Sequence, residues 1–376
     1  MKIAFFVQKF PAISETFILN QITGLIDSGH EIDIYSARSS DEVKIHPDVE
    51  KYNLLKKTHY IDIPKNRALR FFKGFEFLLR NFCKNPRMYL NILDIIIHGK
   101  KTGNLFLFYL ANYFNKDYDI VHCHFGPIGL NAVMLKEIKA PVKKIITTFH
   151  ASDLTVFLKN KNSDVYEDLF KHGDLFLPIS QRWKKRLVEL GCDENRIMVH
   201  HMGVDFRSFK YKPRVPAADG EIRIISVARL VEKKGIEFGI QAVSRLVKSN
   251  QKIKYNIIGD GPLKNEYQKL IQSLGVDKNI KLSGWKRQSE VMENLDKSHI
   301  LLAPSVTAKD GDQEGIPLAL MEAMAMGLPV ISTLHSGIPE LIENGVTGFL
   351  VPEKDASALF HTLKYLIQNP DLCLTI

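Results

Sequence analysis

Short apolar runs of strand length alternate with helical segments along the first half of the chain, and this pattern constrains the fold more than any other feature. A helix is expected at 14–29, with Ser14 as its N-cap and Gly29 at its C-terminal end. Repetition of strand, helix and strand predicts a parallel sheet covered by helices on both faces. The expected strands are 2–8, 30–37, 118–124, 143–150 and 174–180.

The pattern stops at 201–220 and then starts again. This segment contains Pro213 and Pro216, shows little periodicity and carries mixed charge, which predicts a linker. A chain of 376 residues is also too long for one compact core. We therefore expect an α/β protein of two Rossmann-like, doubly wound domains, with ligands in a cleft at the carboxyl ends of the strands. The predicted parts are a first domain at 1–205, a linker at 206–220 and a second domain at 221–376, with strands at 222–230, 253–261, 279–285, 299–305 and 329–333 and helices at 236–249, 262–274, 289–297 and from 317.

Composition is that of a soluble globular protein, with 45% hydrophobic and 25% charged residues. No apolar run reaches the ~18–20 residues of a membrane span, and the N-terminus lacks the pattern of a signal peptide. The four cysteines (Cys83, Cys123, Cys192 and Cys373) have no paired spacing. They fit a reducing cytoplasm better than a disulfide framework or a zinc site.

The net charge of +9 is concentrated in the segment 64–101. Its basic residues stand against only Glu76 and Asp94 and alternate with aromatic and leucine residues. Such a helix suits an anionic membrane surface, and it equally suits a solvated helix whose aromatic side chains face the core. A nucleic-acid partner is disfavoured, because no DNA- or RNA-binding motif accompanies the charge. The basic residues are Lys65, Arg67, Arg70, Lys73, Arg80, Lys84, Arg87, Lys100 and Lys101.

The stretch QEGIPLALMEAMAMGLPVIST, at 313–333, places Glu314 and Glu322 at the two ends of an apolar run. Pro317 is favoured in the first turn of a helix, so Glu314 is expected in the preceding loop and Glu322 on the helix. The backbone N–H groups of Gly315 and Ile316 would then be available to ligand oxygens. Two acceptor carboxylates and a set of N–H donors fit a ligand rich in hydroxyl groups. A helix-capping acid and a surface glutamate would give the same pattern.

Two further loops of the second domain carry candidate ligand-binding residues. Arg229 and Lys234, in VARLVEKKG, span a strand-to-helix turn and are well placed for a diphosphate, although an isolated pair of this kind is commonly just solvated. Gly259 and Gly261, in IIGDGPL, permit a tight turn close to a ligand. The loop lacks the third glycine of the dinucleotide-binding fingerprint.

In the first domain, His150 and Asp153 follow a predicted strand, where a site residue is reasonable. His122 and His124 alternate along one strand, and we expect at least one to be buried and hydrogen-bonded rather than bound to metal. The Asp-x-Asp triplet at 117–119 precedes a strand, and the one at 310–312 lies in a polar loop. Neither is assigned to metal.

These motifs together resemble glycosyltransferase family 4. The Glu-x7-Glu segment is followed by SGIPELIENGVTGFLV at 336–351, and VARLVEKKG, IIGDGPL and LSGW occur in the family's order and spacing. FPAISETFI, at 10–18, is similar to the subset that builds bacterial exopolysaccharide, including colanic-acid-type galactosyltransferases. The resemblance covers nearly the whole chain. It implies the GT-B fold and transfer of a hexose from a nucleoside diphosphate sugar with retention of configuration and no obligatory metal or other cofactor.

The resemblance also implies roles for individual residues. Arg229 and Lys234 would hold the diphosphate, Glu322 the ribose, and Glu314 with Gly315, Ile316 and Pro317 the sugar. Trp285 and Lys286 would lie near the nucleobase, and Gly259 and Gly261 would be further donor-binding residues of the same domain. In the acceptor-binding first domain, His150 would touch the sugar, and Ser14, Glu15, Thr16 and Asp153 would lie near the diphosphate or the acceptor.

The acceptor in this subset is commonly a lipid-linked oligosaccharide, which would bring the segment 64–101 to the inner face of the cytoplasmic membrane. The terminal helix that usually crosses back to the first domain is not visible in the sequence, which stops at IQNPDLCLTI. Two alternatives stay open: a nucleotide-sugar epimerase of the same fold, and a catalytically silent scaffold of a polysaccharide assembly complex. The sugar, the acceptor and the base, uracil or guanine, are also open, with uracil favoured by the subset.

Overall fold

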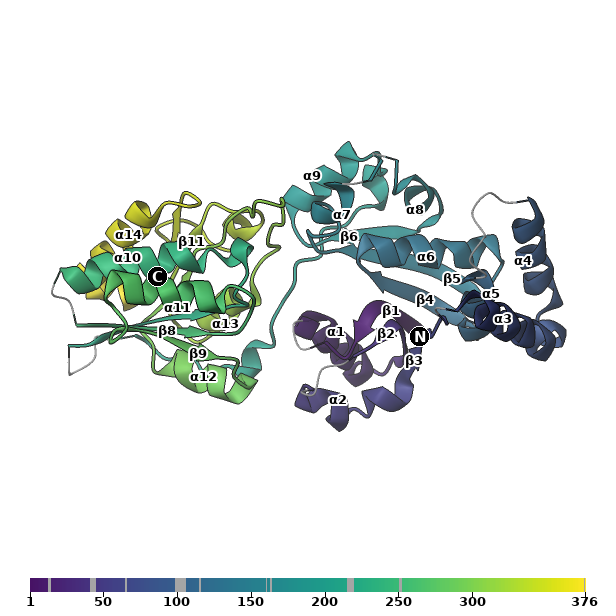
Figure 1. The fold of residues 1–376 in the computed structure, drawn as a ribbon, viewed down its shortest axis with the longest axis horizontal. Helices are drawn as coiled ribbons and strands as arrows, with labels where there is room; N and C mark the ends of the chain where they lie inside the picture. The colour runs from purple at the N-terminus through teal and green to yellow at the C-terminus, as the bar shows by residue number, and fades with distance from the viewer. Residues whose placement is uncertain are drawn as a thin grey trace. The chain divides into compact units, whose positions relative to one another are not determined.

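The computed structural model describes residues 1–12, 15–40, 45–64, 66–98, 106–114, 116–159, 161–162, 164–214, 220–249, 252–374 and 376, without the side chains of 67, 95–98 and 106. The chain divides into two compact units. Unit 1 comprises Met1–Leu154, Asn160–Pro178 and Lys184–His200, and unit 2 comprises Thr155–Lys159, Ile179–Trp183 and His201–Ile376. Each unit is built around its own parallel sheet (Figure 1).

Within the described residues, unit 1 contains a six-stranded sheet in the order β3-β2-β1-β4-β5-β6. Every neighbouring pair is parallel, so each connection must cross back over a face of the sheet. The strands are β1 (Lys2–Phe10), β2 (Glu31–Ser39), β3 (Thr58–Tyr60), β4 (Tyr118–His124), β5 (Val142–Phe149) and β6 (Leu175–Pro178).

Helices cover both faces of this sheet because successive strand residues point to opposite sides. Phe5 and Val7 of β1 pack with Ile18 and Ile22 on the α1 side. Phe6 packs on the other face, 5.5 Å from the ring of Phe114. The helices in this part of the chain are α1 (Thr16–Asp27), α2 (Pro47–Lys51), α3 (Arg67–Asn81), α4 (Pro86–His98), α5 (Phe106–Tyr113), α6 (Gly126–Glu137), α7 (Val156–Lys159), α8 (Glu167–His172) and α9 (Gln181–Glu189), with short 3-10 turns η2 (Leu54–Lys57), η3 (Phe82–Lys84) and η4 (Glu194–Arg196). Of these, α7 and the first residues of α9 belong to unit 2.

The sheet described in unit 2 is also six-stranded and parallel, in the order β12-β11-β10-β7-β8-β9. Read from β9, this is the same order as in unit 1, so the two units repeat one topology. The strands are β7 (Ile222–Val227), β8 (Ile253–Ile258), β9 (Ile280–Gly284), β10 (Ile300–Ala303), β11 (Val330–Thr333) and β12 (Phe349–Val351).

Alternate residues of these strands fill two separate cores in unit 2. Ile224 and Leu302 pack beneath α10, α11 and α14, whereas Ile225 and Leu301 pack beneath α12 and α13. Figure 1 shows α10 and α14 side by side, as their contacts require. The helices are α10 (Ile236–Lys248), α11 (Lys264–Leu274), α12 (Gln288–Asp296), α13 (Leu318–Ala325) and α14 (Ala356–Gln368), with 3-10 turns η5 (Phe206–Ser208), η6 (Glu232–Lys234), η7 (Ile338–Glu340) and η8 (Pro370–Leu374).

The α/β class and the paired doubly wound sheets are confirmed, while some element ends differ from the prediction. Helix α1 begins at Thr16, and Glu15 occupies its N-cap position without a side-chain capping bond. The predicted N-cap, Ser14, lies outside the described residues. Strands β7, β8 and β10 end earlier than predicted, at Val227, Ile258 and Ala303. Gly259 has a φ of 138°, which is not a strand conformation, and Pro304 has no N–H group to continue a ladder. The three-residue strand β3 was not predicted, being too short for a detectable alternation.

The first part of the segment expected to be a linker packs within unit 2. Arg214 is 3% exposed, and its guanidinium donates to the carbonyls of Asp296 and Met326 at the ends of α12 and α13. A cation at two helix C-termini complements their dipoles. The chain is therefore anchored before residues 215–219, which lie outside the described part.

No helix within the described ranges combines the length and the apolar character needed to cross a lipid bilayer. The four cysteines are free thiols.

Candidate active site

The strand order of each sheet reverses at one point, between β1 and β4 in unit 1 and between β7 and β10 in unit 2. Loops after the two strands at such a point diverge to opposite faces and leave a crevice where ligands bind. In unit 2 these loops carry Arg229 and Lys234 after β7 and Glu314 after β10. Topology therefore gathers three predicted site residues at one edge of the sheet.

Lys234 and Glu314 form an ion pair in this crevice. Lys234 Nζ lies 2.7 Å from Glu314 Oε2, and the Glu314 side chain is only 8% exposed. Lys233 Nζ lies 3.7 Å from Glu314 Oε1 and 3.0 Å from Asp312 Oδ2. Burial acts to raise the pKa of Glu314, but the positive charges of Lys234 and Lys233 outweigh it and lower the pKa. The carboxylate is therefore ionised at neutral pH, and its Oε1 has no hydrogen-bond partner among the described residues.

Arg229 contrasts with this pair because it is exposed. No hydrogen bond or ion pair to its guanidinium occurs within the described residues. A small pocket lies beside it at the ends of β7 and β10, lined by Lys234, Ser305 and Pro317 among others. An exposed cation in the same loop as the ion-paired Lys234 is suited to an anionic ligand.

Helix α13 begins as the sequence indicates. Pro317 occupies its N-cap position and Leu318 is the first helical residue, so Glu314 lies in the loop and Glu322 on the helix. The backbone N–H groups of Gly315 and Ile316 find no acceptor in the described part of the chain. They remain available to oxygens of a ligand near the helix N-terminus. Gly327 follows the C-cap with a φ of 75°, the left-handed geometry that ends a helix.

Glu322 differs electrostatically from Glu314. Burial raises its pKa, and a hydrogen bond from Gln288 partly opposes this effect. Gln288 Nε2 donates to Glu322 Oε1 over 3.0 Å. No lysine or arginine pairs with Glu322 among the described residues, so this carboxylate can accept from neutral hydroxyl groups without giving up an ion pair.

Gly259 and Gly261 allow two loops to approach each other. A Cβ on Gly259 would collide with the carbonyl of Ala228, and one on Gly261 with the backbone of Leu230. The approach is fixed by a hydrogen bond of 2.9 Å from Leu230 N to Asp260 O. These glycines thus place the Arg229 loop through backbone packing. Their predicted contact with the donor stays a prediction.

Trp285 and Lys286 follow β9 at the same edge of the sheet. Trp285 is 36% exposed, and Lys286 pairs with Glu290 of α12 over 2.9 Å. Gln288, at the start of α12, connects this loop to Glu322. The loop after β9 and helix α13 are therefore parts of one surface of unit 2.

The corresponding region of unit 1 is a stack of histidines. The rings of His122 and His124 lie 4.8 Å apart, and those of His124 and His150 lie 5.2 Å apart. His124 Nδ1 and His150 Nε2 share a hydrogen bond of 2.9 Å, and His122 Nε2 bonds Thr148 Oγ1 over 2.8 Å. The prediction of a buried, hydrogen-bonded histidine on β4 is confirmed. Burial lowers the pKa of His122 and of His150 to about 3, so both are neutral at physiological pH.

Asp153 holds the turn that carries His150. Its two carboxylate oxygens accept from the backbone N–H groups of Gly126 and His150, each over 3.0 Å. Asp153 is 2% exposed, and burial raises its pKa to about 6 despite these bonds. Its side chain therefore positions the loop rather than facing solvent.

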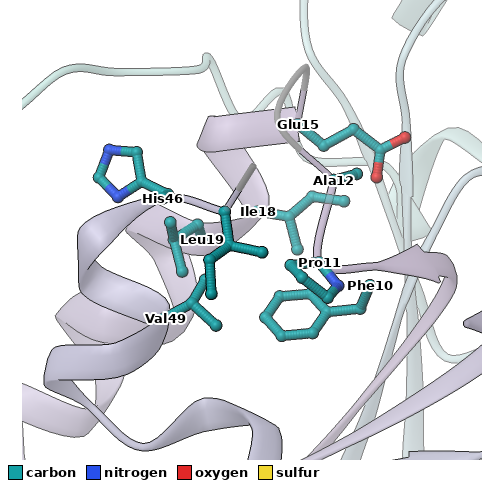
Figure 2. Close-up of a pocket in the computed structure, with 9 residues that line it drawn as sticks. Phe10, Pro11, Ala12, Glu15, Ile18, Leu19, His46 and Val49 are labelled. Atoms are coloured by element: carbon teal, nitrogen blue, oxygen red, sulfur yellow. The ribbon is translucent and has the colours of Figure 1, made fainter. Parts of the chain in front are cut away.

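The loop after β1 borders an apolar pocket. Figure 2 shows Phe10, Ile18, Leu19 and Val49 facing one another, with the carboxylate of Glu15 projecting to one side. Thr16 is the first residue of α1. The structure thus places Glu15 and Thr16 at the carboxyl end of β1, the sheet edge that also carries His124.

Several residues at the unit 2 site were missed by reasoning from the sequence. Lys233 neighbours Lys234, and its basic character was the one available signal. Gln288, His335 and Glu353 have no local pattern that distinguishes them from ordinary surface or core residues. Their roles depend on contacts between loops far apart in the chain.

Comparison with known proteins identifies the family. The model for Glycosyltransferase Family 4 matches residues 14–208, and that for Glycosyl transferases group 1 matches residues 208–376. The chain is 41% identical over 368 residues to the putative colanic acid biosynthesis glycosyltransferase WcaL of Escherichia coli, covering 96% of this chain and 90% of the relative. It is 40% identical over 375 residues to the amylovoran biosynthesis glycosyltransferase AmsK of Erwinia amylovora, covering 98% and 91%.

Solved structures share the fold at low sequence identity. Anabaena HepE in complex with UDP matches with a TM-score of 0.71 and 15% identity, covering 100% of this chain and 92% of that one. The apo lipopolysaccharide outer core galactosyltransferase WaaB matches with a TM-score of 0.64 and 20% identity, covering 98% and 91%. Together, the two parallel sheets and these matches show that the chain has the GT-B fold and belongs to the glycosyltransferases, with a family 4 domain followed by a group 1 domain.

Proposed function

We propose that this glycosyltransferase transfers a hexose from a UDP-sugar to a glycan acceptor, with retention of configuration. We further propose a lipid-linked oligosaccharide as the acceptor, in exopolysaccharide, capsule or lipopolysaccharide biosynthesis. Relatives named for colanic acid and amylovoran biosynthesis support the pathway class. Neighbours solved with UDP and with UDP-glucose support uracil as the base.

The main observation behind the proposal is the cationic crevice at the ends of β7 and β10. Lys234 is held by Glu314, and Arg229 is exposed beside it. In our proposal both bind the donor diphosphate. Their charge then stabilises the nucleotide as it leaves with the bonding electrons of the glycosidic bond. In this proposal no metal is required for the step, because Lys234 and Arg229 supply the electrostatic stabilisation.

The remaining donor contacts follow from position and charge. Glu314 Oε1, which has no hydrogen-bond partner among the described residues, and the N–H groups of Gly315 and Ile316 are proposed to hold the hydroxyl groups of the sugar. Glu322 is proposed to accept from the ribose hydroxyls, and Trp285 and Lys286 to border the base. Each of these groups lies on a loop after the carboxyl end of a unit 2 strand, except Glu322, which lies on α13.

In unit 1, His150 is proposed to contact the donor sugar as a neutral hydrogen-bonding group. Its lowered pKa means that it brings no charge to the reacting carbon at neutral pH. Glu15 and Thr16, and Ser14 outside the described residues, are proposed to border the diphosphate or the acceptor. Asp153 acts through the backbone of His150.

Calorimetry with UDP tests the donor site. The wild-type protein is expected to bind UDP, and the Arg229→Ala/Lys234→Ala double variant to bind it at least about 100-fold more weakly, as the loss of two charged hydrogen-bonding groups predicts. Lys254→Ala is the matched control, because within the described residues the Lys254 ammonium donates to the carbonyl of Lys278 alone, at the opposite end of β8 from the site. Undiminished UDP binding by the double variant would exclude the proposed diphosphate site.

A donor screen by thermal shift separates the remaining alternatives. A true donor among UDP- and GDP-sugars raises the melting temperature by mass action. A transferase should then release nucleoside diphosphate from that donor when a glycan acceptor is added, whereas an epimerase would interconvert the sugar without release. A silent scaffold would bind none of the donors.

We also propose that helix α3 binds an anionic membrane surface. One face of the helix exposes Phe71, Phe72, Phe75 and Leu79, by 51–69% of each side chain. Arg70 and Lys73 lie on the same helix. The alternative, in which these aromatic side chains face the core, is wrong for these residues, although Phe77 does pack on Tyr109 with ring centroids 5.2 Å apart.

Flotation with liposomes tests this surface. The wild-type protein should float with vesicles that contain anionic lipid, and Arg70→Glu/Lys73→Glu should remain in the soluble fraction. Phe206→Ser is the control for general surface hydrophobicity, because Phe206 is 72% exposed and lies on η5 in unit 2. Equal flotation of the charge-reversed variant would exclude α3 as the anchor.

A further inference from the structure

Two consecutive residues after β11 hold the backbone of Glu314 on both sides. The N–H group of Glu314 donates to His335 Nε2 over 3.0 Å, and Ser336 Oγ donates to the carbonyl of Glu314 over 2.6 Å. Ser336 adopts a φ of 50°, a left-handed conformation that is uncommon for a residue with a Cβ. The Glu314 loop has no regular secondary structure, so these side-chain bonds replace the backbone ladder that would otherwise fix it.

The imidazole of His335 is fully buried between this loop and Glu353. Its Nδ1 lies 2.6 Å from Glu353 Oε1, and Glu353 Oε2 accepts from the backbone N–H of Thr307 over 2.6 Å. A backbone N–H can only donate, so Nε2 must carry no proton and Nδ1 must carry one. Burial acts to raise the pKa of Glu353, but the bonds from Thr307 and His335 outweigh it and lower the pKa. An ionised carboxylate is the acceptor that this tautomer needs.

We propose that His335, Ser336 and Glu353 are positioning residues of the donor site. Glu353 fixes the tautomer of His335, and His335 and Ser336 fix the backbone of Glu314. The carboxylate of Glu314 is then directed at Lys234. The next two residues, Gly315 and Ile316, keep their N–H groups available to ligand oxygens. This inference rests on the proposed donor-binding role of Glu314 and Lys234, and it adds the groups that set their geometry.

Glu353→Gln tests the tautomer without changing shape or volume. The carboxylate accepts from three donors: the N–H of Thr307 at Oε2, and Nδ1–H of His335 and the Thr307 hydroxyl (3.3 Å) at Oε1. A glutamine offers these donors a single oxygen. If the oxygen faces Thr307, the amide NH2 faces Nδ1 and drives the imidazole proton to Nε2, against the N–H of Glu314. If the oxygen faces Nδ1, the N–H of Thr307 is left without an acceptor. Either arrangement loses one hydrogen bond of the network.

Two substitutions of His335 separate its two bonds. His335→Gln places an oxygen near the position of Nε2 and can still accept from Glu314, whereas His335→Asn reaches only the position of Nδ1 and can serve only Glu353. We expect UDP affinity to fall about tenfold in Glu353→Gln and His335→Asn, the usual effect of one lost hydrogen bond, and to stay within about threefold in His335→Gln. Glu293→Gln is the matched control, because Glu293 is exposed on α12.

Nitrogen NMR of the histidine rings reads the tautomer directly and needs no ligand. The His335 resonance, assigned by its loss in His335→Gln, should show a protonated Nδ1 and an unprotonated Nε2. A protonated Nε2 in the wild-type protein, or UDP affinity in Glu353→Gln equal to that in Glu293→Gln, would overturn the inference. Failure of the wild-type protein to bind UDP or UDP-glucose would instead count against the proposed donor, and the ring spectrum would still decide the arrangement of His335.

Discussion

The two sheets have the same strand order, yet the residues at their reversal points are electrostatic opposites. In unit 2, Lys234 and Lys233 lower the pKa of the buried Glu314 and keep it charged. In unit 1, burial lowers the pKa of His122 and keeps it neutral. The unit 2 site therefore keeps a buried side chain ionised, whereas burial in unit 1 keeps a side chain neutral. The shared strand order determines where a site can form in each sheet. The side chains on the neighbouring loops determine whether the buried groups of that site are charged.

Removing Lys234 should have the largest effect, because it leaves a buried carboxylate without its closest counter-ion. Lys234→Met is expected to lower the free energy of unfolding by about 3–5 kcal/mol, the usual cost of breaking a buried pair. Lys234→Met/Glu314→Gln should recover part of this loss, since the unpaired charge is gone. Urea unfolding of the three proteins measures both values. If the double variant is less stable than Lys234→Met, Glu314 is not destabilised by losing this partner.

Acid should destabilise unit 1 before unit 2. The folded-state pKa of His122 is about 3 and lies below the unfolded value of 6.5, so the unfolded state binds more protons between these pH values. The stabilising contribution is complete above pH 6.5 and is lost as the pH falls. From pH 6.5 to 5.0, His122 alone should cost about 2 kcal/mol.

The carboxylates of unit 2 behave differently because the pKa of Glu314 and of Glu353 is lowered in the folded state. Their contribution is present above the unfolded value of 4.5 and is lost only below it. Amide hydrogen exchange between pH 6.5 and 5.0, corrected for intrinsic rates, should therefore show protection falling in unit 1 first. His122→Leu should reduce this pH dependence. Equal loss of protection in both units would contradict the contrast between them.

Glu322 provides a contrast within unit 2. Burial raises its pKa, so ionisation of Glu322 at neutral pH works against folding. Glu322→Gln is therefore expected not to lower the free energy of unfolding, while UDP affinity falls about tenfold through the lost acceptor. Thermal unfolding and calorimetry on one preparation measure the two effects. A large loss of stability would mean that Glu322, like Glu314, is held by a positive charge.

Substitutions on the exposed face of α3 should have the smallest effect on folding. Phe72 is 69% exposed, so Phe72→Ser is expected to change the free energy of unfolding by no more than about 0.5 kcal/mol. Liposome flotation of the same variant should nevertheless decrease, because the exposed ring would enter the interface. Phe77→Ser is the informative comparison, since Phe77 packs on Tyr109 and its loss should lower stability. Unchanged flotation of Phe72→Ser would remove this residue from the proposed surface.

The sequence by itself determined the α/β class, most of the strands and the different positions of Glu314 and Glu322 on either side of Pro317. Because a proline cannot continue a helix upstream, the stretch 313–333 could be divided into a loop with Glu314 and a helix with Glu322, and the structure begins α13 at Leu318. The alternation of strands and helices likewise predicted both sheets, since burial of two faces leaves continuous apolar runs. These inferences were possible because they depend only on residues that are close together in the sequence.

Tertiary structure decided which side chains meet. Lys234 and Glu314 are separated by 80 positions, and they pair because the sheet places β7 beside β10. His335 and Glu353 join them because β11 and β12 extend the same sheet edge. Likewise, packing of α3 on α5 covers Phe77 and leaves Phe72 exposed, although both are phenylalanines in one basic helix. Local sequence carries no signal for such contacts, because they depend on the order in which distant strands assemble.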